Sequence, residues 1–138
     1  MQYISKMTNI LMLSGKKLKA EKILKKSFEI IHNRYKKDPT LTFNKAVENV
    51  KPSFEMRSIR VAGRTQQIPF PMKENKQIGL ALKWIVAAVK GTNKSQIFES
   101  LAFEIHEASM GKGFAIKKRD LLHKSAESNR AFAHFRWS

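Results

Sequence analysis

The chain has 138 residues, which suits one ordinary domain and leaves no room for two. Apolar residues make up 42% of it and charged residues 28%, a composition typical of a folded chain with a hydrophobic core. Lys and Arg number 27 against 11 Asp and Glu, giving a net charge of +16. In such a small domain the excess positive charges repel one another unless an anionic partner neutralises them. Nucleic acid is therefore the expected partner, and an anionic membrane surface comes second.

Several kinds of site and segment are disfavoured. The apolar run from Ile85 to Val89 is far shorter than the roughly 20 residues that cross a bilayer, so no membrane-spanning segment is expected. Without cysteine the chain has no disulfides or thiolate metal sites, as in proteins of reducing compartments. Its four histidines include no pair four residues apart, so we expect neither a metal site nor a cofactor. The first 14 residues lack the features of a removable targeting peptide.

Apolar residues spaced three and four apart predict three helices in the first 50 residues. The first covers Ile4–Leu13, and the second covers Lys17–Tyr35 with a basic exterior. Thr40 is expected to cap a third helix, which continues through Asn49 and is stopped by Pro52. The N-terminal part is therefore predicted to be helical.

The residue pattern changes between about 54 and 72, where two stretches rich in Ile, Val, Phe and Thr flank Gly63. Glycine can supply the positive φ that a chain reversal needs, so this segment is predicted to be a β-hairpin. Its apolar alternation is imperfect, which predicts either a bulge or a twisted ribbon. Pro69 and Pro71 suit an edge strand or a strand end, so the hairpin is expected to protrude from the body.

Three more helices are predicted after the hairpin. One covers about 75–89, and the next begins after Asn93 or Ser95 and ends at Gly111. The last begins near residue 116, reaches about 129, and leads into a tail that ends at 138. The residues expected to face the body from this last segment are Ile116, Leu121, Leu122, Ala126 and Phe132. The sequence therefore predicts a mainly α single domain, 1–138, of about six helices, with a β-hairpin protruding between the third and fourth helices.

Short matches to catalytic patterns stand alone. Ser14 and Lys17 have the S-x-x-K spacing of serine acyl enzymes, but the companion motifs are missing. Glu104 and Glu107 lie three apart on a predicted helix, where a solvated face or a local ion pair is the ordinary interpretation. We therefore expect neither an enzyme nor a small-molecule substrate.

Basic residues, by contrast, gather at several places. Each group alone is more often a solvated surface, but their coincidence with the net charge favours RNA or DNA as the partner. A helical DNA-binding module is the rival, although such modules concentrate their contacts on one groove-entering element and these groups are dispersed. The groups are Lys16 and Lys17 at a helix start, Arg57, Arg60 and Arg64 on the hairpin, the seven-residue repeat of Lys76, Lys83 and Lys90, and Lys112, Lys117, Lys118 and Arg119 around the start of the last helix.

Aromatic residues and histidines add fewer signals. Trp84 is expected to pack in the core, whereas Trp137, beside Arg136, is as well suited to contact RNA or a neighbouring protein as to pack on its own domain. His123 is expected to be a surface or half-buried residue, with phosphate binding or base stacking as the alternative.

Several stretches together resemble one family, that of small-subunit ribosomal protein seven of the bacterial and organellar type. The resemblance covers nearly the whole chain. The motifs that carry it include Ala46-Val-Glu-Asn-Val-Lys-Pro52 before the hairpin and Arg60-Val-Ala-Gly-Arg-Thr65 at its tip. The other matching stretches are 9–17, 67–69, 81–85, 117–119, 123, 126–127 and 129–137.

The resemblance implies a structural protein that binds small-subunit rRNA in the head domain and nucleates head assembly. It also implies that the hairpin and last helix face the exit-site tRNA and the mRNA path, near small-subunit protein eleven and other head proteins. The expected tRNA- and mRNA-facing hairpin residues are Arg60, Gly63, Arg64 and Thr65. The expected rRNA-binding residues are Lys16, Lys17, Arg57, Lys76, Lys83, Lys112, Lys117, Lys118, Arg119, Arg130, Arg136 and Trp137.

The chain departs from the family pattern in two ways: the basic arm before the first helix is almost absent, and Ala62 replaces one of two adjacent glycines at the hairpin tip. The short start, a bias toward Lys, Ile and Phe, and the Phe-Arg-Trp ending resemble a member encoded in mitochondria. A place in the mitochondrial ribosome is therefore expected, with the bacterial cytoplasm or a plastid as the alternative.

Overall fold

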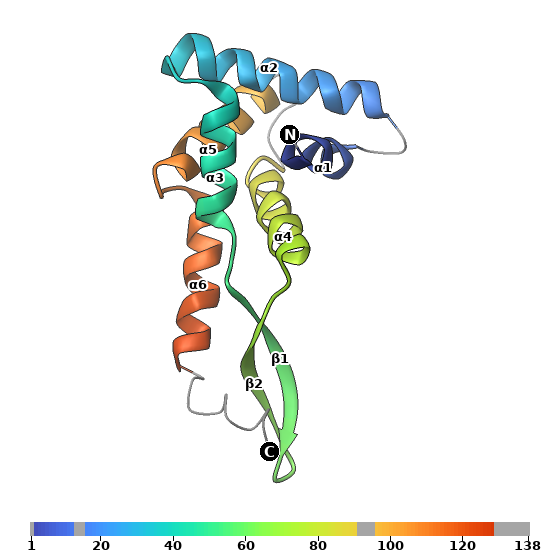
Figure 1. Cartoon of the computed structure of the whole chain (residues 1–138), viewed down its shortest axis with the longest axis vertical. Coiled ribbons are helices and arrows are strands. Elements are labelled where there is room, and N and C mark those ends of the chain that lie inside the picture. Colours follow the sequence, from blue (N-terminus) through green and yellow to red (C-terminus); the bar gives the residue numbers. More distant parts are fainter. Residues whose placement is uncertain (1, 13–15, 91–95, 129–138) are drawn as a thin grey trace.

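The computed structural model describes residues 2–12, 16–90 and 96–128, which form six helices and one two-stranded hairpin (Figure 1). This confirms the predicted fold class and the place of the hairpin between the third and fourth helices. The elements are α1 (Gln2–Leu11), α2 (Lys17–Tyr35), α3 (Pro39–Val50), β1 (Phe54–Val61), β2 (Arg64–Pro71), α4 (Glu74–Ala87), α5 (Ile97–Ser109) and α6 (Phe114–Ser128).

The core forms where the apolar stripes of the helices meet. Phe43 of α3, Ile85 of α4 and Ile105 of α5 are fully buried, and each belongs to a stripe predicted from its spacing. Burial of such a side chain contributes roughly 1.5–3 kcal/mol. The stripes therefore fix which face of each helix points inward and leave the lysine-rich faces in solvent.

The first helix is attached to the body by polar contacts as well as by its buried Met7. The Tyr3 hydroxyl donates to Glu48 Oε1 at 2.5 Å, which raises the pKa of Tyr3 to about 12 because the hydrogen bond and the nearby carboxylate disfavour the phenolate. Lys6 Nζ also donates to Asn75 Oδ1 at 3.5 Å. These contacts connect α1 to α3 and α4.

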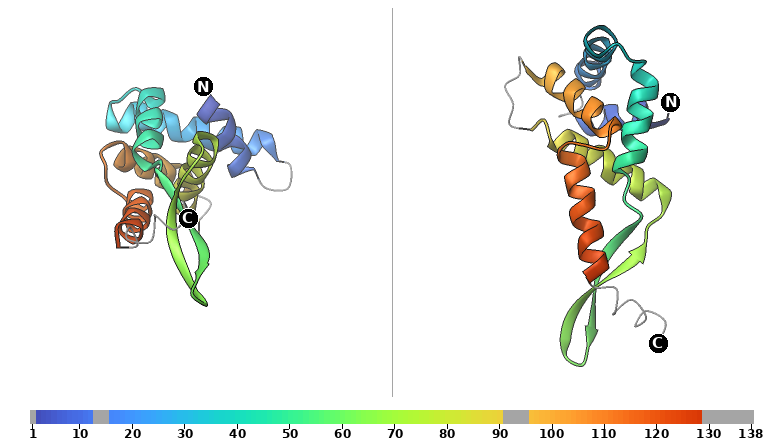
Figure 2. Two further views of the ribbon diagram at one scale, coloured as in Figure 1. Left: turned by 60° about the horizontal axis from the view of Figure 1, so that its bottom comes forward. Right: turned by 90° about the vertical axis from the view of Figure 1, so that its left-hand side faces the viewer.

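The hairpin extends beyond the helices in every view and is visibly twisted (Figures 1 and 2). Its register is continuous from Phe54↔Pro71 to Val61↔Arg64, so the twisted alternative is correct and the bulge is absent from the paired strands. The reversal uses two residues, Ala62 and Gly63, with φ of 51° and 79°. Two positive φ values define the type I′ geometry, whose twist matches that of paired strands.

The helix starts differ from the prediction at α1, α3 and α6, and α1 begins at Gln2, two residues before the predicted Ile4. Asp38, not Thr40, caps α3: its Oδ1 accepts from the Leu41 N–H at 3.1 Å, and Pro39 takes the first helical position, where no N–H is needed. The last helix begins at Phe114, two residues before the predicted start. Its start is stabilised by the Glu104 carboxylate of α5, which accepts from the Ala115 N–H at 2.9 Å.

The prediction for one residue of the last helix, that it faces the body, is wrong. Leu121, predicted to face the body, is 62% exposed. The inward side of α6 carries the buried Ala115 and Ile116 at its start and then Arg119 and His123, which contact α3 and the base of the hairpin. Polar contacts of this kind interrupt the apolar period from which the inward face was predicted.

Candidate nucleic-acid interface

The turn before α2 presents two of the predicted cations. Lys16 occupies the position before the helix, Lys17 is its first residue, and both side chains are exposed. Neither forms an ion pair with any residue that the structure describes. Their ammonium groups are therefore available to an anionic partner.

The base of the hairpin holds a three-residue cluster that the sequence alone did not reveal. Glu55 Oε1 lies 2.6 Å from Arg57 Nη2 on the same strand, and its Oε2 lies 2.6 Å from Lys76 Nζ on α4. The hydrogen bond from Lys76 and then that from Arg57 hold the pKa of Glu55 below its usual value. The structure thus brings two predicted RNA-binding cations together around one carboxylate.

A sequence signal for this cluster exists. Residues 55 and 57 are two apart in a strand and therefore share a face, which favours pairing of Glu55 with Arg57. The third member, Lys76, is 21 positions from Glu55, so only the fold shows that it joins them. Arg57 also lies over the Phe70 ring, with its guanidinium carbon 4.9 Å from the ring centroid.

The tip of the hairpin carries the residues expected to face tRNA and mRNA. Arg60 and Thr65 are register partners, and Arg64 follows Gly63 directly. All four are exposed, at the end of the ribbon farthest from the helices (Figure 1). Within the described ranges, neither arginine forms an ion pair. The tip is therefore a cationic projection whose charges have no ion-pair partner among the described residues.

The outer faces of α4 and α6 carry a further set of cations. Lys83 of α4 and Lys112, Lys117 and Lys118 near the start of α6 have exposed side chains. Lys118 Nζ lies 5.5 Å from the centroid of the Phe114 ring. These lysines extend the positive surface from the hairpin onto the helical body.

Arg119 differs from its neighbours because it has protein partners. Its Nη1 donates to the carbonyl oxygen of Asn49 at the end of α3, and its Nη2 pairs with Asp120 at 2.7 Å. The guanidinium therefore connects α6 to α3. Contact with RNA stays a prediction for this residue, and it would use the donors that these bonds leave free.

His123 joins the hairpin to the body. Its ring is half-buried 5.0 Å from that of Phe54, and its Nε2 accepts from the Ser53 N–H at 3.4 Å. Gln77 of α4 donates to the Ser53 carbonyl at 3.4 Å. Desolvation, then Arg119, lowers the pKa of His123, which favours the neutral ring. The half-buried interpretation is thus confirmed, and the histidine orients the hairpin.

The remaining predicted aromatic and C-terminal residues fall into two groups. Trp84 is half-buried and packs against the core, which confirms the core interpretation. Arg130, Arg136 and Trp137 lie outside the described residues, so their expected contacts with RNA stay predictions.

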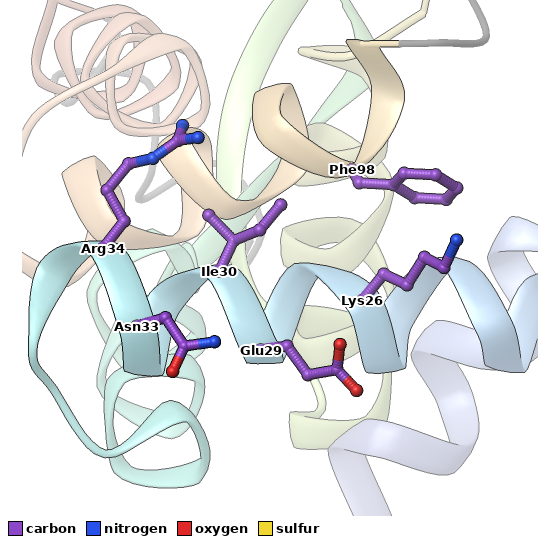
Figure 3. A pocket seen from close by; sticks show the side chains of 6 residues that line it. All are labelled: Lys26, Glu29, Ile30, Asn33, Arg34 and Phe98. Atoms are coloured by element: carbon purple, nitrogen blue, oxygen red, sulfur yellow. The ribbon is translucent and has the colours of Figure 1, made fainter.

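A separate cleft of about 500 Å³ lies between α2 and α5 (Figure 3). Lys26 Nζ lies 4.8 Å from the centroid of the Phe98 ring on one side, and Arg34 pairs with Glu99 at 3.6 Å. Glu29 adds a second carboxylate. Because cations and carboxylates nearly balance here, this face differs from the cationic surface of the hairpin and α6.

Other kinds of site are not seen in the part of the chain that the structure describes. No helix there is long and apolar enough to cross a membrane. No group of three His, Asp or Glu side chains within residues 2–12, 16–90 and 96–128 is arranged to hold a metal ion.

The fold and surface define a small, strongly basic helical protein whose cations spread over a projecting hairpin and the helices beside it. The chain belongs to the family described as ribosomal protein S7p/S5e, whose model matches residues 1–130. Small ribosomal subunit protein uS7 of Sorangium cellulosum is 45% identical over 134 residues, covering 97% of this chain and 86% of the relative. The proteins of the same name from Kosmotoga olearia and Bartonella henselae are 46% and 39% identical over the same coverage.

Proposed function

We propose that this chain is a non-enzymatic structural constituent of the small ribosomal subunit, where it binds rRNA of the head domain and nucleates head assembly. Membership of the S7p/S5e family and relatives named small ribosomal subunit protein uS7 support the ribosomal role. The net charge of +16 supports an RNA partner, because phosphates would relieve the self-repulsion of the fold.

The observation that carries the proposal is the spread of exposed cations over four separate elements. Lys17 on α2, Arg60 on β1, Lys83 on α4 and Lys117 on α6 cannot all enter one groove of a straight duplex. A folded RNA presents phosphates from several helices at once and can meet such a surface. Dispersed contacts of this kind organise RNA, since they hold its helices in one relative arrangement.

The hairpin is proposed to line the path of exit-site tRNA and mRNA, next to small-subunit protein eleven and other head proteins. Its eight-residue strands extend about 26 Å at roughly 3.3 Å per residue, far enough to hold the tip away from the helical body. Arg60, Arg64 and Thr65 at the tip offer donors to a phosphate backbone.

A binding experiment tests the rRNA proposal. The purified chain should bind a folded head-domain fragment of small-subunit rRNA, and log Kd should rise steeply with log salt, since several phosphates are neutralised. A random DNA duplex with the same number of phosphates is the control. Equal affinity for the two would contradict a role in organising rRNA.

We also propose that the chain works in the mitochondrial ribosome, as its bias toward Lys, Ile and Phe favours. An antibody against the chain should detect it on the small subunit of mitochondrial ribosomes separated on a density gradient. Recovery on bacterial or plastid particles instead would refute this location and leave the ribosomal role intact.

A further inference from the structure

A second cleft, of about 360 Å³, lies between the start of α3 and the end of α5, which pack side by side (Figure 1). Two aliphatic side chains line it: Leu41 is 67% exposed and Met110 is 45% exposed. Lys37 and Lys45 line the same cleft. None of these four residues belongs to the cationic surface of the hairpin, α4 and α6.

The backbone around the aliphatic pair is held in place. The Asp38 carboxylate accepts from the Leu41 N–H at 3.1 Å, which fixes the first turn of α3. Asn49 Nδ2 donates to the carbonyl oxygens of Ala108 and Ser109 at 3.0 and 3.1 Å, which fixes the end of α5 against α3. The cleft is therefore preorganised, so a ligand would not have to order its walls.

Leu41 is not part of the core stripe of its helix. The inward face of α3 carries Phe43, Ala46, Val47 and Val50, all fully buried. Leu41 lies outside this stripe and leaves apolar surface in water, so burial of that surface by a partner would favour binding.

Positive charge surrounds the aliphatic pair. Across the described ranges neither Lys37 nor Lys45 forms an ion pair, and Lys36 lines an adjoining cleft that shares Lys37 and Asp38. The one carboxylate of the lining, Asp38, is used by the α3 backbone. The surroundings thus complement carboxylates of a partner.

The lining favours protein over nucleic acid. Unstacked bases bind to aromatic rings or to guanidinium planes, and the residues that line this cleft include neither. A leucine and a flexible methionine thioether instead suit an apolar side chain of a protein partner. We propose that this cleft docks a segment of another protein that presents an apolar side chain flanked by Asp or Glu.

A peptide tests the chemistry directly. A fluorescein-labelled Asp-Asp-Leu-Leu-Glu-Glu peptide should bind the full chain saturably in fluorescence anisotropy, and Leu41→Ala or Lys45→Glu should each weaken binding about tenfold. Leu121→Ala and Lys25→Glu change an exposed leucine and an exposed lysine outside this cleft, so the affinity for the peptide should stay unchanged. Equal losses in test and control variants would overturn the proposal, as would no binding at all.

A crosslink tests the site in the particle, and this arm rests on the proposed ribosomal function. The photoreactive p-benzoylphenylalanine placed at position 41 in assembled small subunits should crosslink to a segment of a neighbouring protein in which Asp or Glu flanks an apolar residue. A crosslink to RNA, to a segment without acidic residues, or to nothing would overturn it. Leu41→Ala should keep full affinity for the rRNA fragment, so failure here is distinct from failure of the rRNA proposal.

Discussion

Ala62 at the hairpin tip has a backbone conformation that suits glycine better than alanine. Its φ of 51° places it in the left-handed region, where a Cβ costs roughly 1–2 kcal/mol. Ala62→Gly removes that cost but adds about 0.4–1 kcal/mol of unfolded-state entropy. We expect a net gain of about 0.5–1 kcal/mol in the free energy of unfolding, measured by urea denaturation.

A matched control separates this effect from glycine substitution in general. Ala87, the last residue of α4, has ordinary helical geometry, so Ala87→Gly should lose up to about 1 kcal/mol. Destabilisation by both variants would mean that the strain at the tip is relieved in some other way.

Glu55 holds the side chains of Arg57 and Lys76 in place through two ion pairs. Glu55→Gln adds one positive charge and frees Arg57 and Lys76, so affinity for non-specific single-stranded RNA should rise a few-fold and its salt dependence should steepen. The preference for the head-domain fragment should fall, because the two side chains lose their fixed positions. Filter binding at several salt concentrations measures both.

Glu21→Gln makes the same charge change at an exposed site on α2, where no ion pair is seen among the described residues. If Glu21→Gln lowered the preference for the head-domain fragment as much as Glu55→Gln does, the change in net charge would account for the effect, and the positioning of Arg57 and Lys76 would not.

Glu104 couples stability to pH. Burial raises the pKa of this carboxyl, so its folded-state pKa exceeds its unfolded one. Its contribution to stability is then fully present below the unfolded pKa and is lost as pH rises through the folded pKa. Glu104→Gln keeps an acceptor for the Ala115 N–H but loses the one for Phe114, and it carries no charge at any pH, so its stability relative to the natural protein should rise as pH rises from about 4.

Urea denaturation of both proteins across this pH range measures the difference, with Glu107→Gln on the same helix as the control. A difference that stays constant with pH would show that Glu104 does not carry the titration.

At the scale of elements, the tip and the base of the hairpin are expected to have different roles, the tip in binding and the base in folding. Its tip residues Arg60 and Arg64 are exposed and make no ion pairs within the described ranges, whereas its base is joined to α6 by His123. Replacing both arginines by Ala should therefore leave the unfolding temperature within a few degrees of its original value. Affinity for RNA that the tip contacts should fall about tenfold or more.

The measurement pairs thermal denaturation with RNA binding for the double variant. A sharp drop in unfolding temperature would instead place these arginines among the residues that hold the hairpin together. Lys25→Ala on α2 is a charge-changing control that leaves the hairpin intact.

At the scale of the whole molecule, the net charge of +16 sets how the isolated protein responds to salt. Self-repulsion destabilises the compact state, and added salt screens it over a Debye length of about 10 Å at 0.1 M. The unfolding temperature of the isolated chain should therefore rise with NaCl. Circular dichroism melts measure it, and a decrease with salt would show that attractive ion pairs such as Glu55–Lys76 outweigh repulsion.

The sequence by itself determined the fold class, because the fold depends on local periodicity. The stripes of α3, α4 and α5 follow the helical period, and the hairpin is marked by Gly63 between two β-prone stretches. The positive surface was also predicted, because unpaired lysine side chains are too costly to bury and must lie on the outside of the fold.

Only the tertiary structure decided contacts between residues distant in sequence. Glu55 pairs with Lys76, and Arg119 donates to the Asn49 carbonyl oxygen. The Glu104 carboxylate accepts from the Ala115 N–H at the start of α6, two residues before the predicted start of that helix. Pairings of this kind depend on how the helices pack, and no local period records them. The same holds for the cleft at Leu41, where an ordinary exposed leucine becomes part of a site because α5 brings Met110 beside it.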